Sequence, residues 1–192
     1  MSNTTWTGSS STDWATGANW STGSVPTTGA HIVIPDTSSI NNCVLDQSRT
    51  IGSLTIQANG TLVGGGFTLN VTSEGDAAGG TEHYAVNIDG IISGDLNLNI
   101  TTADSTNLDI IPSSGNVHDL VINLGDAARI AKIQTGGPTL TGDLTITSGQ
   151  LSTENNSLTV TGTIDVDGGN LDIKTSAVSC AKLIVESGDT IT

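Results

Sequence analysis

Carboxylates at recurring positions are the residues in this chain whose types and spacing could support chemistry. Asp143, Asp165 and Glu186 occupy related places in successive stretches of similar sequence. Glycoside hydrolysis requires two carboxyl groups about 5 Å or about 6.5–9.5 Å apart across a sugar-sized groove. Residues 140–192 contain no Trp, Tyr or Arg to line such a groove. We therefore interpret these acids as solvated corner residues and expect no enzyme, with a polysaccharide-degrading enzyme as the less favoured alternative.

Metal binding is the second chemistry that the acids raise. Asp165, Asp167 and Asp172 form an oxygen-rich cluster of the kind that Ca²⁺ prefers, but the glutamate that closes an EF-hand loop is missing. The histidines stand apart from each other and from both cysteines, unlike the ligands of a zinc site: His31, His83 and His118. We predict no cofactor, with a weak Ca²⁺ site near Asp165 as the alternative.

The tryptophans are the third group with a chemical use. Trp6, Trp14 and Trp20 all precede the first strand-like run and lie in a segment that is otherwise rich in Gly, Ser and Thr. Exposed indole faces bind sugars by stacking, so these residues are candidate glycan-binding residues. Large aromatic side chains also suit a lid over the open end of a stacked β-fold. We favour the lid and keep the glycan site as the alternative.

A sequence repeat predicts the strands that position these residues. Leu144, Ile164 and Leu183 open similar segments about 20 residues apart, within the range of solenoid repeats. Apolar residues within each segment recur at every second position, as in a strand with one buried face. Gly, Asn, Asp and Ser between them suit tight corners. The pattern predicts an all-β, single-stranded parallel β-helix (β-solenoid) with roughly eight or nine coils of about 20 residues.

Two regions of the chain depart from this repeat. The first is residues 1–30, which we predict to form a Trp-rich cap before the β-helix of residues 31–192. Ser73–His83 is the longest polar interruption and reads as a loop that leaves the coil. Because loops on rigid scaffolds often carry function, the loop's exit supplies further candidate binding residues: Glu82, His83 and Tyr84.

The lead-in also carries a resemblance. Trp6-x-Gly8, Asn19-Trp20, Val25-Pro26 and Ile32–Pro35 form a W…NW…P…IxIP pattern. This pattern is similar to the opening of right-handed parallel β-helix proteins of phage virion fibres and bacterial surface adhesins. The resemblance implies a right-handed coil and a structural or adhesive role, although Ala30-His31 replaces the Asp that usually follows the lead-in glycine.

Composition limits the partners. The formal net charge is −14 with only five basic residues, so the chain lacks the Lys and Arg that neutralise nucleic-acid phosphates or attract anionic lipids. No apolar run approaches the length of a membrane helix, and no signal peptide is recognisable. Cys43 and Cys180 lie several coils apart, too far for a disulfide. We expect no nucleic-acid binding and no membrane insertion.

The last repeat breaks off at Ile191-Thr192 with nothing to shield the final coil. An uncovered coil favours pairing with another strand-forming surface. We therefore expect either a longer chain or self-association with a neighbouring structural subunit. The resulting hypothesis is a non-enzymatic structural or adhesive module of a phage virion fibre or appendage, located in the virion or outside the cell. A fragment of a bacterial cell-surface adhesin is the alternative, and a cell-surface glycan is the alternative partner.

Overall fold

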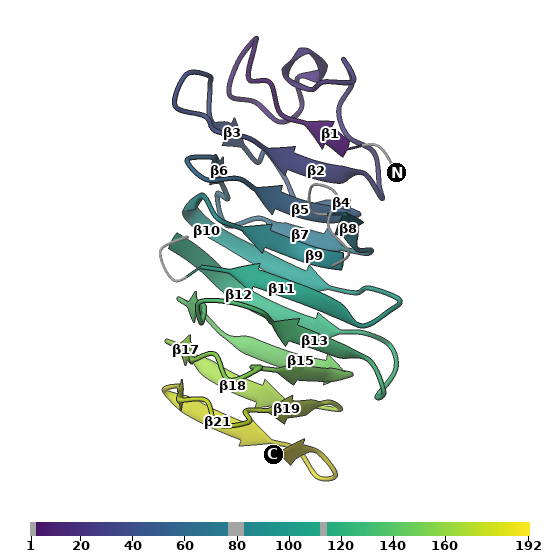
Figure 1. The fold of residues 1–192 in the computed structure, drawn as a ribbon, viewed down its shortest axis with the longest axis vertical. Coiled ribbons are helices and arrows are strands. Elements are labelled where there is room, and N and C mark those ends of the chain that lie inside the picture. The colour runs from purple at the N-terminus through teal and green to yellow at the C-terminus, as the bar shows by residue number, and fades with distance from the viewer. Residues whose placement is uncertain (1–2, 77–82, 112–114) are drawn as a thin grey trace.

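The computed structural model describes residues 3–76, 83–111 and 115–192 and arranges them as one elongated stack of short strands (Figure 1). Nearly all strand pairs are parallel, and the described residues contain one short 3₁₀ helix, η1 (Gly17–Asn19). The chain winds downward from the N-terminal cap, adding one coil after another (Figure 1). The predicted all-β parallel β-solenoid is confirmed.

One face of the solenoid is a single sheet in which each coil contributes one strand. Its strands stack in chain order: β1 (Asn3–Thr5), β2 (His31–Ile34), β5 (Ser53–Ile56), β9 (His83–Ile88), β11 (Thr106–Ile110), β13 (Ile130–Ile133), β16 (Gln150–Ser152), β19 (Asn170–Asp172) and β22 (Thr190–Ile191). The short β8 (Gly75–Asp76) pairs with β9 in the antiparallel sense.

The second sheet folds over two further faces, which makes the coil three-sided. One face contains β3 (Cys43–Val44), β6 (Thr61–Val63), β14 (Thr139–Leu140), β17 (Leu158–Val160) and β20 (Val178–Ser179). The other contains β4 (Arg49–Ile51), β7 (Thr68–Val71), β15 (Leu144–Ser148), β18 (Thr163–Val166) and β21 (Lys182–Val185). The long strands β10 (Ile91–Ile100) and β12 (Gly115–Asn123) run along both faces and join them.

The length of the coils differs between the two halves. Leu151 pairs with Leu171 and Leu171 with Ile191, so the last coils keep the constant interval that the repeat predicts. Near the N-terminus, Ile32 pairs with Leu54 and Leu54 with Val86, and both of these coils are longer. The number of coils between β2 and β22 is therefore smaller than a uniform period predicts. The loop predicted at Ser73–His83 falls within the longest coil, and its middle lies outside the described residues.

Aliphatic rows fill the interior. Residues that pair across successive coils turn the same side chain inward, as in the row of Leu120, Leu144 and Ile164, each at most 1% exposed. Burying such a side chain contributes about 1.5–3 kcal/mol. Both cysteines are free, as predicted, with Cys43 fully buried and Cys180 half-buried. Burial raises the pKa of the Cys43 thiol well above its usual value.

Polar side chains complete the ladder at one corner. The Asn97 side-chain oxygen accepts a hydrogen bond from the Asp119 backbone N–H at 3.3 Å. Asp119 Oδ1 accepts from the Asp143 N–H at 2.9 Å, and Asp143 Oδ1 from the Thr163 N–H at 2.6 Å. A Cβ atom on Gly162 would collide with Asp143 Oδ1, so glycine at this position makes room for the carboxyl group.

The Trp cluster covers the N-terminal end. Trp20 lies between the other two indoles, with ring centroids 5.0 Å from Trp6 and 4.7 Å from Trp14 in edge-to-face arrangements. The fully buried Asn19 organises the loop beside them, because its side-chain oxygen accepts hydrogen bonds from the N–H groups of Ser10 and Ser11 at 2.9 Å. These contacts explain the Asn-Trp pair of the lead-in.

The C-terminal end is open. Leu183 continues the inward row of Leu144 and Ile164 but is 50% exposed, and Val185 is 42% exposed. An apolar cleft of about 180 Å³ opens there between the three faces. It is lined by Ile164, Leu171, Ile173, Val178, Cys180, Leu183 and Ile191. The two ends of the rod therefore differ: one is covered by aromatic rings, and the other exposes its core.

Candidate functional site

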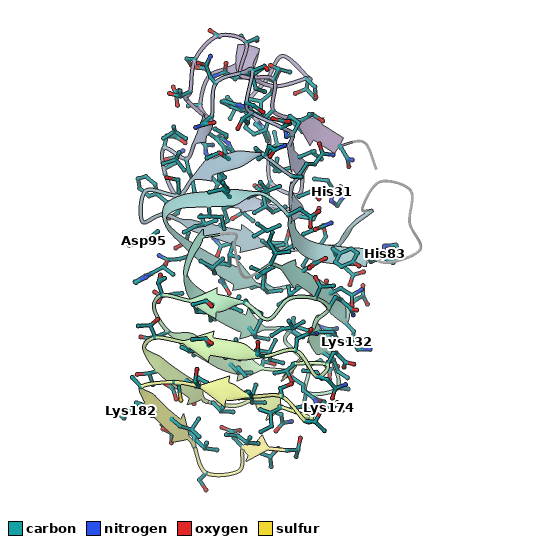
Figure 2. All side chains as sticks on the ribbon, turned by 60° about the vertical axis from the view of Figure 1, so that its left-hand side comes forward. His31, His83, Asp95, Lys132, Lys174 and Lys182 are labelled. Atoms are coloured by element: carbon teal, nitrogen blue, oxygen red, sulfur yellow. The ribbon has the colours of Figure 1, made fainter. Side chains whose placement is uncertain are left out.

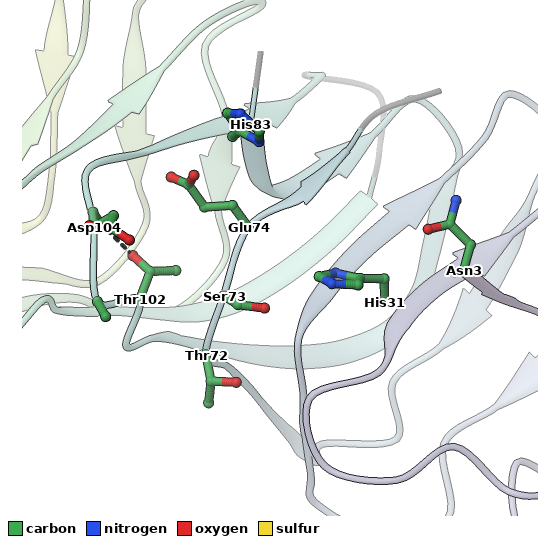
Figure 3. Close-up of a pocket in the computed structure, with 9 residues that line it drawn as sticks. Asn3, His31, Thr72, Ser73, Glu74, His83, Thr102 and Asp104 are labelled. Carbon is green, nitrogen blue, oxygen red and sulfur yellow. Dashed lines mark hydrogen bonds between the residues drawn. The ribbon is translucent and has the colours of Figure 1, made fainter. Parts of the chain in front are cut away.

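A hollow of about 410 Å³ lies at one corner of the N-terminal half (Figure 3). Its walls come from the segments that leave the second sheet and enter the first. Thr72–Glu74 follow β7, Thr102–Asp104 connect β10 to β11, and Asn3, His31 and His83 are the first residues of β1, β2 and β9. Because parallel strands of a solenoid start at the same edge, segments far apart in sequence meet at this corner.

Glu74 is the most unusual side chain in the hollow. Its carboxyl group extends between His83 and the Thr102–Asp104 turn (Figure 3). Oε1 is buried and has no hydrogen-bond partner among the described residues. Burial raises the pKa of Glu74, and the charge of Asp104 adds to this effect, whereas the Thr106 hydroxyl group and His83 oppose it.

Two histidines lie on the same wall but in different environments. His31 is 5% exposed, and its Nδ1 lies 2.8 Å from the Ser53 hydroxyl group. Burial lowers the pKa of His31, so its ring is neutral at physiological pH. His83 is exposed at the rim. Both histidines lie on the same side of the rod in the view of Figure 2.

The hydroxyl groups around the hollow are partly used by the backbone. Thr72 donates to the Ile51 carbonyl at 2.9 Å, and Thr102 donates to the Asp104 carbonyl at 2.9 Å. The Ser73 hydroxyl group has no hydrogen-bond partner in the part of the chain that the structure describes, and it points toward His31 (Figure 3). The Ser73 hydroxyl group is therefore the one that a ligand could contact, whereas Glu74 Oε1 is too deeply buried to be touched from the hollow.

The structure places the predicted binding residues in two separate regions. Trp6, Trp14 and Trp20 are at most 2% exposed, so no ring face is open for a sugar to stack on, and the lid interpretation accounts for them. His83 lines the hollow, and Tyr84 is the half-buried next residue of β9. Glu82 lies outside the described residues.

Sequence reasoning missed most of this hollow. Within the predicted loop Ser73–His83, Glu74 carries no separate assignment, and the sequence does not connect His31 or Asp104 with it. A carboxylate shortly after a strand is the available signal for position 74. Its burial depends on β9 and on the turn before β11, and no sequence period reveals that arrangement.

The three acids at related places in the sequence, Asp143, Asp165 and Glu186, do not form a row in the structure, so the geometry required by the less favoured enzyme alternative is not found among them. Asp143 lies beside Thr163, whose backbone N–H it binds, and Asp165 pairs with Ile184 in the next coil. Asp143 is committed to the corner ladder, where it binds a backbone N–H. Glu186 lies just beyond these pairs, since its N–H donates to the Val166 carbonyl. The acids therefore do not face one another across successive coils.

Asp165, Asp167 and Asp172, the candidate calcium ligands, are not arranged around a common site. Asp172 forms an ion pair with Lys174 at 2.6 Å, and this hydrogen bond lowers the pKa of Asp172. Across residues 3–76, 83–111 and 115–192, no group of three or more His, Cys, Asp or Glu side chains is placed to hold a metal ion. The Asp165–Asp172 segment instead contains the end of β18, a turn and β19, and its last residue pairs with Lys174.

Comparison with known proteins gives one partial match. Residues 5–83, less than half of the chain, match the model of a domain of unknown function (DUF8693). No curated protein and no solved structure matches the chain. The matched segment contains the Trp cluster, the first coils and part of the hollow, including Glu74 and His83. None of the helices in the described chain has the length and apolarity needed to cross a membrane.

Proposed function

We propose that this chain is a non-enzymatic structural and adhesive module, a rigid rod that presents side surfaces for binding and assembles through its open end. Following the resemblance of its lead-in, we place it in a phage virion fibre or appendage, or in a bacterial surface adhesin. The single observation that carries this proposal is the contrast between the two ends of the rod. One end is sealed by Trp6, Trp14 and Trp20, and the other exposes Leu183 and Val185.

Rigidity is supported by the continuity of the ladders. Each strand of the first face hydrogen-bonds to its neighbours in the adjacent coils, from β1 to β22. The inward rows pack without interruption until the last coil. Each coil contacts only its neighbours, so the stack extends in one dimension, as in other repeat proteins.

Assembly is supported by the exposed core. In the preceding coil, Ile164 and Val166 occupy the positions equivalent to Leu183 and Val185 and are fully buried. An exposed apolar cleft beside unpaired strand edges is a surface that proteins normally cover. Because the Trp cluster closes the opposite end, two copies would meet end to end through their open coils. Such a two-fold contact gives a discrete dimer and not a growing fibre.

Light scattering coupled to size-exclusion chromatography tests this proposal. We expect the wild-type protein to shift from monomer to dimer as its concentration rises. The double variant Leu183→Glu/Val185→Glu should remain monomeric, because charges replace the apolar contact. Ile91→Glu is the matched control: Ile91 is 48% exposed but lies on β10, away from the open end. A wild-type protein that stays monomeric at every concentration contradicts assembly by self-association.

A further inference from the structure

β21 is the longest strand edge at the open end of the rod. The last strands of the three faces are β20, β21 and β22, and of these only β21 has more than two residues. Its one partner among the described strands is β18 of the preceding coil, and its other edge faces the open end (Figure 1). A strand with a free edge is a template for pairing with a further strand.

The backbone groups on this free edge belong to Leu183 and Val185. Alternate residues of a strand direct their N–H and C=O groups to opposite neighbours. The Glu186 N–H donates to the Val166 carbonyl at 3.0 Å, so the even-numbered positions of β21 are those that bond to β18. Leu183 and Val185 therefore direct their backbone groups away from the preceding coil. Their side chains are also the exposed inward ones, at 50% and 42%.

A two-fold contact between open ends determines the sense of the strand pair. The two-fold axis reverses the direction of β21, so the strand meets its copy in the antiparallel sense. Opposite residues of an antiparallel pair exchange N–H···O bonds only where the backbone groups of both point toward the partner. Three registers satisfy this condition: Leu183 opposite Leu183, Leu183 opposite Val185, and Val185 opposite Val185.

The side chains select one of these registers. With Leu183 opposite Val185 of the second copy, Ile184 meets Ile184, and Lys182 meets Glu186 twice by symmetry. Lys182 and Glu186 are exposed, and strand alternation places both on the outer face with Ile184. Apolar side chains thus meet apolar ones, and opposite charges meet each other. The other two registers set Lys182 opposite Ile184 or Gly188 and form no charge pair.

We propose that two copies of this chain join by antiparallel pairing of β21 with itself, centred on Ile184, and that Lys182 and Glu186 set the register. The joint continues the second sheet from one rod into the other. It places the two apolar clefts, each lined by Leu183, next to each other on its inner face. This contact rests on the proposed assembly through the open end and adds to it the strand, the register and the charge pairs.

Cysteine cross-linking of the full chain tests the register. Because Ile184 directs its backbone groups to β18, Ile184 and its copy form a non-hydrogen-bonded pair with Cα atoms about 4.5 Å apart, within the range of a disulfide. Ile184→Cys should therefore give a covalent dimer under mild oxidation. Both this variant and its control carry Cys180→Ser, since Cys180 lines the cleft at the same end.

Lys182→Cys is the matched control, because position 182 lies on the outer face of the same strand. The register separates the two copies of this residue by the rise of four residues, about 14 Å, which is too far for a disulfide. At a protein concentration where light scattering shows a dimer for both variants, Lys182→Cys should not cross-link.

Exchange of the charges tests the residues that set the register. Lys182→Glu and Glu186→Lys each place two like-charge pairs in the contact, so each should weaken self-association by about tenfold. A mixture of these two variants should form a mixed dimer, because their edges carry opposite charges. The double variant Lys182→Glu/Glu186→Lys should dimerise like the wild type.

Asp95→Lys is the control for net charge. It makes the same change in charge as Glu186→Lys, but Asp95 is exposed on β10, far from Lys182 (Figure 2). This variant should dimerise like the wild type.

Each outcome decides the proposal. A dimer of Ile184→Cys that resists cross-linking, or equal cross-linking at positions 182 and 184, overturns the register. A wild-type dimer that neither single charge variant weakens overturns the role of Lys182 and Glu186, but leaves assembly through Leu183 and Val185 standing. A wild-type protein that is monomeric at every concentration overturns this contact together with the assembly on which it rests.

Discussion

The Trp cap allows a prediction in which two similar substitutions have different costs. Trp14 and Trp20 are both buried, at 0% and 2% exposure, so replacing either by Phe removes a similar volume. Their indole N–H groups differ. Trp20 Nε1 donates to the Trp14 carbonyl at 2.8 Å, whereas Trp14 Nε1 is buried without an acceptor among the described residues. We expect Trp20→Phe to be the more destabilising change.

The size of the difference follows from the groups left behind. Trp20→Phe leaves the buried Trp14 carbonyl without its donor, which costs about 1–3 kcal/mol. Trp14→Phe removes a buried donor that had no partner among the described residues, so it incurs no such loss. Arg49 lies 5.8 Å from the Trp14 ring centroid, and weakening this contact costs at most about 0.5–1 kcal/mol. With the middle of each range, the net prediction is that Trp20→Phe is less stable than Trp14→Phe by about 1 kcal/mol.

Urea denaturation followed by far-UV circular dichroism measures this difference, since fluorescence would change with each Trp removed. Hydrogen exchange of the β1 and β2 amides locates it in the cap, because a stack of coils can open locally. Equal destabilisation by the two variants, or a larger effect of Trp14→Phe, would refute the assignment of these indole hydrogen bonds.

Three other predictions concern the cysteines, Glu74 and the corner ladder. Cys180 should react with a thiol reagent such as DTNB much faster than Cys43, which should react only on unfolding; equal rates would contradict the burial of Cys43. The pKa of Glu74, which faces His83 and Asp104, is raised in the native state, so the native state binds the extra proton. The unfolding free energy of the wild type should therefore fall relative to that of Glu74→Gln as pH rises above about 4.5. Urea denaturation of both proteins at several pH values measures this, and a constant difference between their unfolding free energies would contradict it. Gly162→Ala should lower the thermal midpoint of unfolding, because the added Cβ atom collides with Asp143 Oδ1. Adding Asp143→Ala should recover part of this loss, since it removes the carboxyl group. Equal midpoints for Gly162→Ala and the wild type would contradict the close approach of Asp143 to position 162.

The repeat was predictable where each coil is built alike. In the last coils, Leu151, Leu171 and Ile191 recur at a constant interval with glycine shortly before each strand, so the period is visible in the sequence. In the first coils, loops of different length separate equivalent strands, and Leu54 pairs with Val86 across the excursion. A search for one period cannot align such coils, and it overestimates their number.

The site was harder to predict, because it depends on register and on burial. Strand register pairs Asp165 with Thr145 and not with Asp143, although both acids accompany similar apolar patterns. The residues that line the hollow together with Glu74 come from distant parts of the sequence: His31 from β2, His83 from β9 and Asp104 from the turn before β11. The Trp cluster was predicted correctly as a lid, because three large aromatic residues directly before the first coil have a clear structural use.

Small-angle X-ray scattering on a size-exclusion column tests whether the rods assemble through their open ends. The nine strands of the first face's main stack, spaced by about 4.8 Å, give a monomer about 40 Å long along the axis. Two rods joined at their open ends should give a particle of twice the monomer mass and about 80 Å in stacked length. Leu183→Glu/Val185→Glu should return both values to those of the monomer. A dimer or trimer that keeps the monomer's axial length, with the rods side by side, would contradict assembly through the open end.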